Sequence, residues 1–329
     1  MNVAGIDVAA KSLTVVTLLG ETLGKARERA NDAAGHARLV KQLAAARVER
    51  VCLEATGSYH LDLALALDAA GIAVMTVNPR AAKSFAAALL ARHKSDAVDA
   101  GVLAQFARRM PFAPWTRPSA SALELRACAR RLNALVEART QAKNQLHAAR
   151  QSLTTPAVVL EDIETSLAQS DAQIAKLRAW AEACVAADPE LGAIFALLTS
   201  VKGIAAASAI RLMGEILVLP PDLRAKQWVA QAGLDPRQAS SGTSVAKKPR
   251  LSKAGNRYLR QALFMPALSA VRHEPQVAAY FRHLVETRGL KKIQAICAVM
   301  RKLLHAIHGM LASRQPFDGS RFYTPATAA

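Results

Sequence analysis

Aromatic residues and cysteines are scarce in this chain of 329 residues. Phe, Trp and Tyr make up 5% of the sequence, whereas hydrophobic residues make up 52%. This balance favours helical packing of Ala, Leu and Val over an all-β sandwich. The four cysteines, Cys52, Cys128, Cys184 and Cys297, are scattered and form no Cys-x-x-Cys pair. Their spacing argues against disulfides and against a zinc site.

No stretch reads as a membrane span or as a secretion signal. The most apolar stretch, residues 61–77, is interrupted by Asp62 and Asp68 and contains Gly71. The first residues, Met-Asn-Val-Ala-Gly-Ile-Asp, contain no basic segment followed by an apolar run. We therefore expect a cytoplasmic protein without a membrane partner.

Acidic residues are outnumbered, with 25 Asp and Glu against 43 Lys and Arg, so the net charge is +18. Residues 191–329 contain most of the excess, with 20 basic and 6 acidic residues, whereas residues 119–190 contain 8 and 9. Positive charge concentrated in one region favours a polyanionic partner, above all nucleic acid. A basic surface that serves only solubility is the alternative, and acidic lipid is a weaker candidate because the basic residues form no single short cluster.

Residues 1–117 are expected to form an α/β domain. Strands are predicted at 3–8, 12–19, 24–29, 50–54 and 71–77, and helices are predicted after Asn31-Asp32, over 58–70 and up to Arg109. Three meandering strands, a helix and then alternating strands and helices follow the element order of a ribonuclease-H-like domain. Pro111, Pro114 and Pro118 mark the linker after it.

Residues 118–188 are expected to form a coiled coil. No glycine occurs from 119 to 187, and Pro156 is the only proline there. The preceding helix is basic and the helix with the heptad pattern is acidic, so an intrachain hairpin and a dimerisation arm both remain open. The seam residues alternate in steps of three and four: Leu160, Ile163, Leu167, Ser170, Ile174, Leu177, Ala181 and Cys184.

Residues 189–329 are expected to form a mostly helical domain. A long polar stretch runs over residues 235–255, and amphipathic helices are predicted near 257–270 and 293–311. Within the polar stretch, residues 240–244 read as a flexible loop.

Four acids in the first domain occupy positions that suit metal chemistry. Asp7 lies on the first strand, Glu54 ends the fourth, and Asp96 and Asp99 share one face of a helix. Carboxylates that converge must be neutralised by protons or by cations. Oxygen ligands without His or Cys favour Mg²⁺ or Mn²⁺, and such ions can promote phosphoryl transfer. Each acid also has an ordinary interpretation, because Asp7 could close a turn and Asp96 could cap a helix.

Short motifs in both halves of the sequence resemble the IS110 family of insertion-sequence transposases, which is related to a pilin-gene-inverting recombinase. They occur in order along nearly the whole chain. In the N-terminal half they are Gly5-Ile6-Asp7-Val8-Ala9, Leu53-Glu54-Ala55-Thr56-Gly57-Ser58-Tyr59, Val77-Asn78-Pro79 and Lys94-Ser95-Asp96-Ala97-Val98-Asp99-Ala100. In the C-terminal half they are Gly233-Leu234-Asp235-Pro236-Arg237, Ser241-Gly242-Thr243-Ser244, Leu251-Ser252-Lys253-Ala254-Gly255-Asn256 and Leu259-Arg260-Gln261-Ala262-Leu263.

The resemblance implies a RuvC-like N-terminal domain, a central coiled coil and a helical C-terminal transposase domain. It implies that Asp7, Glu54, Asp96 and Asp99 are catalytic and bind the metal, and that Ser241 is the nucleophile. It also implies DNA and a structured noncoding bridge RNA as partners, with dimers that assemble into tetramers. The expected function is that of a DNA recombinase that forms a covalent phosphoserine and works near the nucleoid.

Basic residues near Ser241 and on the helix of the coiled coil are candidates for nucleic-acid binding. The ordinary interpretation of each is a solvated surface residue, and for those of the coiled coil a second alternative is that they face the acidic partner helix. Residues 201–205 weakly resemble a helix-hairpin-helix turn. The candidates are Arg126, Arg130, Lys247, Lys248, Arg250, Lys253, Arg257 and Arg260.

Two other functions remain open at this point. One is a RuvC-like, Mg²⁺-dependent Holliday-junction nuclease that uses water and only the four acids. The other is a nonenzymatic, basic nucleic-acid-binding protein in which the acids are structural.

Overall fold

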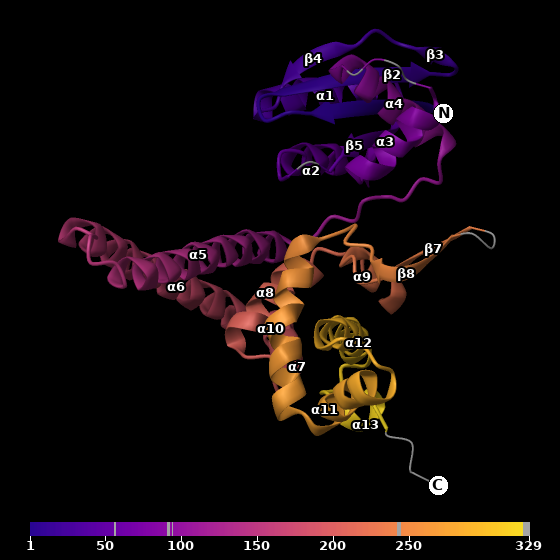
Figure 1. Ribbon diagram of the computed structural model, residues 1–329. Helices are drawn as coiled ribbons and strands as arrows, with labels where there is room; N and C mark the ends of the chain where they lie inside the picture. The colour runs from indigo at the N-terminus through magenta and orange to yellow at the C-terminus, as the bar shows by residue number, and fades with distance from the viewer. Residues whose placement is uncertain (56, 91–92, 94, 242–244, 325–329) are drawn as a thin grey trace. The chain divides into compact units, whose positions relative to one another are not determined.

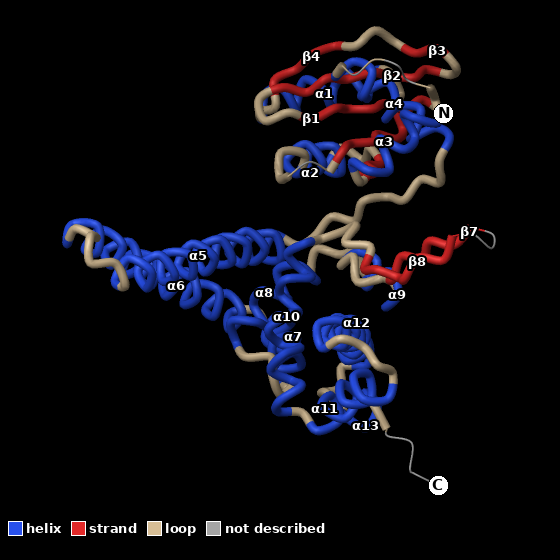
Figure 2. Tube along the Cα trace, in the orientation of Figure 1, coloured by secondary structure: helices blue, strands red, loops and turns tan. Residues whose placement is uncertain are grey.

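The computed structural model describes residues 1–55, 57–90, 93, 95–241 and 245–324, and it describes side chains outside residues 238–249. The chain divides into two compact units, Met1–Arg117 and Pro118–Ala329, drawn in Figures 1 and 2. Each unit has hydrophobic clusters of its own. The division of the chain into three domains stays a prediction.

The first unit is built on a mixed sheet with the strand order β3-β2-β1-β5-β6, and β4 also pairs with β2. β1 is antiparallel to β2 and parallel to β5, which is parallel to β6. This is the sheet of a ribonuclease-H-like fold, as the sequence predicted. The strands are β1 (Asn2–Val8), β2 (Ser12–Leu19), β3 (Thr22–Leu23), β4 (Arg27–Ala30), β5 (Val48–Glu54) and β6 (Ala73–Val77).

The single strand predicted near 24–29 is two short strands, β3 and β4. Between them the amide of Gly24 donates to the carbonyl of Thr17 at 2.8 Å. A β-carbon on Gly24 would lie 2.8 Å from the Thr17 hydroxyl. The chain therefore passes close to β2 at this point, and its pairing with β2 resumes at Arg27.

Helices cover both faces of this sheet. Leu39 and Leu43 of α1 and Leu63 and Leu67 of α2 are buried in one hydrophobic cluster with Ile6. On the other face, Leu103, Ala104 and Ala107 of α4 are buried with residues of β1, β2, β5 and β6. The helices are α1 (Ala33–Ala45), α2 (Leu61–Ala69), α3 (Pro79–Ala88) and α4 (Asp96–Arg109).

The second unit begins with a helical hairpin, α5 (Ala120–Arg150) and α6 (Ala157–Ala187), visible in Figure 1. Every residue of the predicted seam on α6 is buried or half-buried, whereas most residues between them are exposed. Ion pairs join the helices at Arg139–Asp171, 2.5 Å, and Arg150–Glu164, 2.7 Å. The two helices therefore pair within the chain, with complementary charge.

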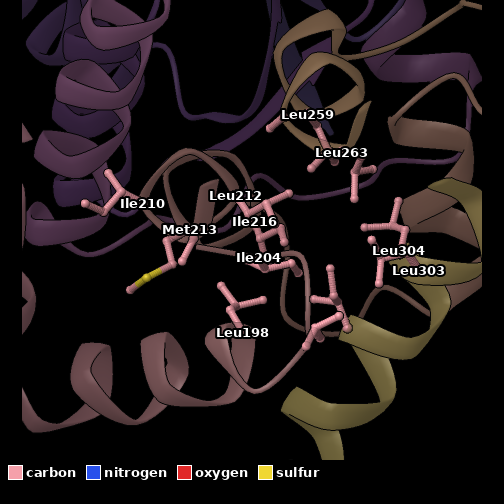
Figure 3. Close-up of a cluster of buried hydrophobic side chains, with 14 of the residues drawn as sticks. Leu198, Ile204, Ile210, Leu212, Met213, Ile216, Leu259, Leu263, Leu303 and Leu304 are labelled. Carbon is pink, nitrogen blue, oxygen red and sulfur yellow. The ribbon is translucent and has the colours of Figure 1, made fainter. Parts of the chain in front are cut away.

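The rest of the second unit is a helical core with one projecting β-hairpin. Figure 3 shows the buried aliphatic residues of the core, which include Leu198, Ile210, Leu263 and Leu303. The elements are α7 (Pro189–Thr199), α8 (Ala206–Ile216), α9 (Ala225–Gln231), β7 (Pro236–Ser241), β8 (Val245–Leu251), α10 (Arg257–His273), α11 (Pro275–Arg282), the π-helical η1 (His283–Thr287), α12 (Lys292–Ser313) and α13 (Gly319–Phe322).

The polar stretch at residues 235–255 contains the antiparallel strands β7 and β8. Alternation of apolar and polar residues, which marks most half-buried strands, is missing there because the hairpin projects from the core (Figure 1). The predicted loop at 240–244 is therefore corrected at Ser240 and Ser241, which belong to β7; residues 242–244 lie outside the described residues.

Helix α12 is long and apolar enough to cross a membrane, with a mean hydropathy of 1.3 over its best window. No such span was expected from the sequence. Eight of its residues are buried, among them Val299, Leu303 and Ile307. Their burial in the helical cluster gives α12 the pattern of a core helix.

Candidate active site

The position of Asp7 is set by the pairing of β1 with its two neighbours. Asp7 lies opposite Thr14 in β2 and is half-buried, so it does not close a turn. In the parallel pair, Ile6 lies opposite Leu53. Glu54 is therefore the next residue at the carboxyl end of β5, where it pairs with Val77 of β6. The first two predicted acids thus lie at the same edge of the sheet.

The other two acids lie in the first turn of α4. Ser95 is the N-cap, and its hydroxyl accepts a hydrogen bond from the amide of Val98 at 3.3 Å. Asp96 is therefore free of the capping role that was its ordinary interpretation. Asp96 is exposed and Asp99 is half-buried, and their spacing of three places both on one side of the helix.

Gly5 lets α4 approach β1 closely enough to bring these pairs together. A β-carbon on Gly5 would overlap the carbonyl oxygen of Ala100 and the amide nitrogen of Ala104, and it would lie 2.7 Å from the carbonyl carbon of Leu103. Any side chain at this position would displace the helix that carries Asp96 and Asp99.

The pKa of Asp7 is raised, in part by the charges of the other three acids. Burial raises this pKa most, and the charges of Asp96, Asp99 and Glu54 raise it further, against a hydrogen bond from the amide of Val8 that lowers it. Among the residues that the structure describes, no three His, Cys, Asp or Glu side chains are placed to hold a metal ion. The acids therefore repel one another without forming a closed ligand cage. Their donor set, oxygen only, fits Mg²⁺ or Mn²⁺.

Asn31 links two loops beside the acids, which its sequence pattern did not indicate. Its side-chain amide donates to the carbonyls of Ala9 and Tyr59, at 2.8 and 3.2 Å. It thereby links the loop that follows Asp7 to the loop that follows Glu54. Buried His36 lies 2.7 Å from the Asn31 amide oxygen. The sequence signal at this place was interpreted only as a helix cap, a role that Asp32 fulfils.

In the second unit, Ser241 is the last residue of β7 and its backbone lies opposite Val245 of β8. Its side chain, like those of Lys247 and Lys248, lies outside the described residues.

The base of the hairpin is fixed by the meeting of two motifs that are distant in sequence. Gly233 has a φ of +62°, and a β-carbon there would lie 2.9 Å from the carbonyl carbon of Lys253. The amide of Lys253 donates to the carbonyl of Gly233 at 3.1 Å. The hydroxyl of Ser252 donates to the carboxylate of Asp235 at 2.6 Å. Backbone approach and hydrogen bonds therefore hold both strands where the hairpin leaves the core.

Buried Glu215 of α8 links this base to the coiled coil. It is 2% exposed and accepts two hydrogen bonds from Arg130 of α5, at 2.8 and 3.0 Å. It also accepts one at 2.5 Å from Asn256, whose side-chain oxygen caps α10. Burial lowers the pKa of Arg130, but Glu215 and, less strongly, Tyr258 raise it, so the pKa lies above its usual value. Glu215 therefore joins α5, α8 and α10.

The candidate nucleic-acid contacts fall into two groups. Arg130 pairs with Glu215 rather than with the acidic helix, Arg126 lies within electrostatic range of both, and Arg260 donates to the carbonyl of Ala232 at 2.8 Å. Arg130 and Arg260 thus have a role within the fold, and nucleic-acid binding by all three stays a prediction. The exposed members are Arg250, Lys253 and Arg257.

In the segment at residues 201–205, which resembles a helix-hairpin-helix turn, the glycine is needed for packing. Gly203 has a φ of +124°, and a β-carbon there would lie 2.6 Å from the amide nitrogen of Ala270 in α10. Close helix packing thus accounts for this glycine.

Sequence comparison identifies relatives along most of the chain. A model described as "Transposase" matches residues 4–153, and one described as "Transposase IS116/IS110/IS902 family" matches residues 195–282. The chain is 29% identical over 274 residues to the pilin gene-inverting protein of Moraxella bovis, covering 81% of each. It is 28% identical over 155 residues to an IS110 insertion-element protein of Streptomyces coelicolor, covering 46% of this chain and 37% of that one.

Among solved structures, Thermus thermophilus RuvC in complex with a Holliday junction substrate aligns with 35% of this chain and 99% of its own, at 21% identity and a TM-score of 0.29. The family matches include the segments that carry Asp7, Glu54, Asp96 and Asp99 and the segment that carries Ser241. The chain therefore belongs to the IS110 family of transposases.

Proposed function

We propose that this transposase is a bridge-RNA-guided recombinase that cleaves DNA through Ser241, with Mg²⁺ or Mn²⁺ bound by Asp7, Glu54, Asp96 and Asp99. The observation that supports it most is the placement of the acids: Asp7 and Glu54 lie at one edge of the sheet, and α4, which packs against Gly5 of β1, carries Asp96 and Asp99 in its first turn. The charges of the other three acids also raise the pKa of Asp7, after burial. A divalent cation would relieve this repulsion and could stabilise the charge that develops on a transferred phosphoryl group.

In the proposed step, the Ser241 hydroxyl oxygen attacks a backbone phosphorus and loses its proton. The bond to the leaving sugar oxygen breaks, and that oxygen takes up a proton. The new serine phosphodiester conserves the linkage for rejoining, which hydrolysis would lose. The hairpin base at Gly233 and Lys253 would hold the nucleophile in place, while the exposed Arg250 and Arg257 contact phosphates.

The partners follow from the resemblance and from the charge of the second unit. A structured noncoding RNA would select the DNA, and dimers pairing into tetramers would bring acids and serine together. The basic surface suits both nucleic acids. We place the protein in the cytoplasm, at the nucleoid.

A covalent-adduct assay tests this function. Protein is mixed with the DNA of the element's ends, its flanking transcript and Mg²⁺, then denatured and separated on a gel. We expect a protein–DNA adduct that Ser241→Ala and Asp7→Asn abolish and that the neighbouring Ser240→Ala retains. Cleavage without an adduct, equal in wild type and Ser241→Ala, would instead establish a nuclease that uses water. Binding without any cleavage would indicate a nonenzymatic protein.

A further inference from the structure

A pocket lies between the base of the β7–β8 hairpin and the first turns of α12. Its volume is about 610 Å³, within the range of roughly 300–1,000 Å³ common for ligand sites. Leu234 and Leu251 line it on the hairpin side and Ile293 on the α12 side. Ile293 is 56% exposed, so an aliphatic side chain of a core helix faces solvent here. We call this site the α12 pocket.

The polar residues of the α12 pocket are predominantly cationic. Arg250, Lys253 and Arg301 line it, and none of the described lining residues is acidic. Burial raises the pKa of the Cys297 thiol, which also lines the pocket, and the charge of Lys253 lowers it. The positive charge of Lys253 is therefore felt inside the pocket, at Cys297.

The backbone at Lys253 is fixed by the base of the hairpin, where its amide donates to the carbonyl of Gly233. Lys253 has a φ of +51°, a conformation that glycine or asparagine adopts at lower cost. The neighbouring Gly255, at a φ of +146°, is a glycine because a β-carbon would lie 2.9 Å from the Ala230 carbonyl oxygen. The hairpin base therefore holds this backbone in place, and the exposed Lys253 side chain lines the pocket.

Aliphatic walls and cations without acids suit a ligand with one flat apolar group and attached phosphate. In duplex DNA the faces of the bases are stacked and cannot enter a pocket, whereas an unpaired base can. One wall of the pocket belongs to the β7–β8 hairpin, which also carries Ser241.

We propose that the α12 pocket holds an unpaired nucleotide of the DNA strand, with its base against Leu234, Leu251 and Ile293 and its phosphates at Arg250, Lys253 and Arg301. This inference rests on the proposed function, because it takes the hairpin as the element that receives DNA. The pocket would fix the register of the strand relative to the serine.

Cys297 reports on occupancy in the full-length protein. Its labelling by a maleimide is followed by mass spectrometry, with half-buried Cys184 of α6 as the internal control. We expect a short single-stranded DNA to slow labelling of Cys297 several-fold and to leave Cys184 unchanged. A duplex, an RNA strand and heparin should each protect Cys297 less. If heparin protects Cys297 as well as single-stranded DNA does, the site recognises charge alone. If RNA or a duplex protects Cys297 equally well, the ligand is a different one, and if nothing protects it, the pocket is no nucleotide site. Each of these results would overturn the proposal.

A matched pair of exposed substitutions gives the second test. Ile293→Glu places a carboxylate in the pocket, whereas Val158→Glu makes the same charge change at a residue of α6 that is 67% exposed. We expect Ile293→Glu to weaken binding of single-stranded DNA by about 10-fold or more, because it removes one aliphatic wall and adds a charge that repels phosphate, and we expect Val158→Glu to have little effect. Equal affinities would overturn the proposal.

The two proposals fail separately. Ser241→Ala should still show protection of Cys297, because it leaves the pocket unchanged. Protection without any adduct in wild type would contradict the serine mechanism alone, and an adduct without protection would contradict the pocket alone.

Discussion

Gly5 of β1 lies against Ala100 of α4 so closely that a β-carbon on Gly5 would overlap the carbonyl oxygen of Ala100. Gly5→Ala should therefore push α4 off the sheet and separate Asp96 and Asp99 from Asp7. We expect a loss of about 3 kcal/mol or more in the free energy of unfolding, because backbone atoms cannot move aside as a side-chain end can, and loss of DNA cleavage. Urea denaturation and the cleavage assay measure the two effects.

Gly101 is the matched control within α4. A β-carbon there would lie 3.6 Å from a methyl carbon of Leu23, an ordinary contact. Gly101→Ala should stabilise the protein by roughly 0.5–1 kcal/mol, since glycine inside a helix costs that much. If Gly5→Ala proves as harmless as Gly101→Ala, the proposed packing of α4 is wrong.

The repulsion around Asp7 should cost stability when no cation is bound. Asp7→Asn removes one charge from the cluster, so we expect it to raise the free energy of unfolding in EDTA by an amount on the order of 1 kcal/mol. Mg²⁺ should raise the melting temperature of the wild type, because it binds only the folded cluster, but much less that of Asp7→Asn. Calorimetry with and without Mg²⁺ makes the comparison. Equal Mg²⁺ shifts in both proteins would show that the ion binds elsewhere.

Glu215 should contribute more to the free energy of unfolding than the exposed acids of the same unit do. Glu215→Gln leaves the Arg130 guanidinium without its carboxylate, and removing one partner of a buried pair costs about 3–5 kcal/mol. Glu164→Gln breaks the exposed pair with Arg150 and should cost less than about 1 kcal/mol. Equilibrium unfolding in urea compares the two variants, and similar losses would refute the linking role of Glu215.

Ser170 is the polar position in the seam of α6. Ser170→Leu adds apolar area to a half-buried site facing α5, and we expect a gain of about 1 kcal/mol. Gln169→Leu adds the same side chain to the exposed neighbouring position and should change stability little. Thermal unfolding of the two variants gives the difference. If only Gln169→Leu increases the stability, the seam has been assigned to the wrong face of α6.

Much of the first unit could be predicted because its signals are local. Apolar residues on both sides of Asp7 and before Glu54 marked strands, and Ser95 followed by Asp96 and Asp99 marked a helix start. The close contact at Gly5 and the links made by Asn31 were not predictable, because each depends on segments that meet only in the fold. The spacing of Gly5 before Asp7 was visible, but nothing in one sequence showed what would lie against it.

The second unit was less predictable for physical reasons of its own. The seam of α6 follows from heptad spacing, but only the fold shows that α5 covers it. Glu215 pairs with Arg130, 85 residues away, and no short-range pattern encodes such a pair. The strands around Ser241 lack apolar alternation, so their sequence reads as a loop. The interior of α12, by contrast, has the periodicity of a core helix.

Mapping the covalent adduct to a residue tests the central proposal most directly. The adduct is digested to peptides and nucleotides, and tandem mass spectrometry locates the residue that carries the nucleotide. Four hydroxyls compete within one short segment, Ser240, Ser241, Thr243 and Ser244. The proposal predicts a nucleotide on Ser241, formed only when Asp7 and a divalent cation are present. A nucleotide on another residue, or cleavage with no modified peptide, would contradict it.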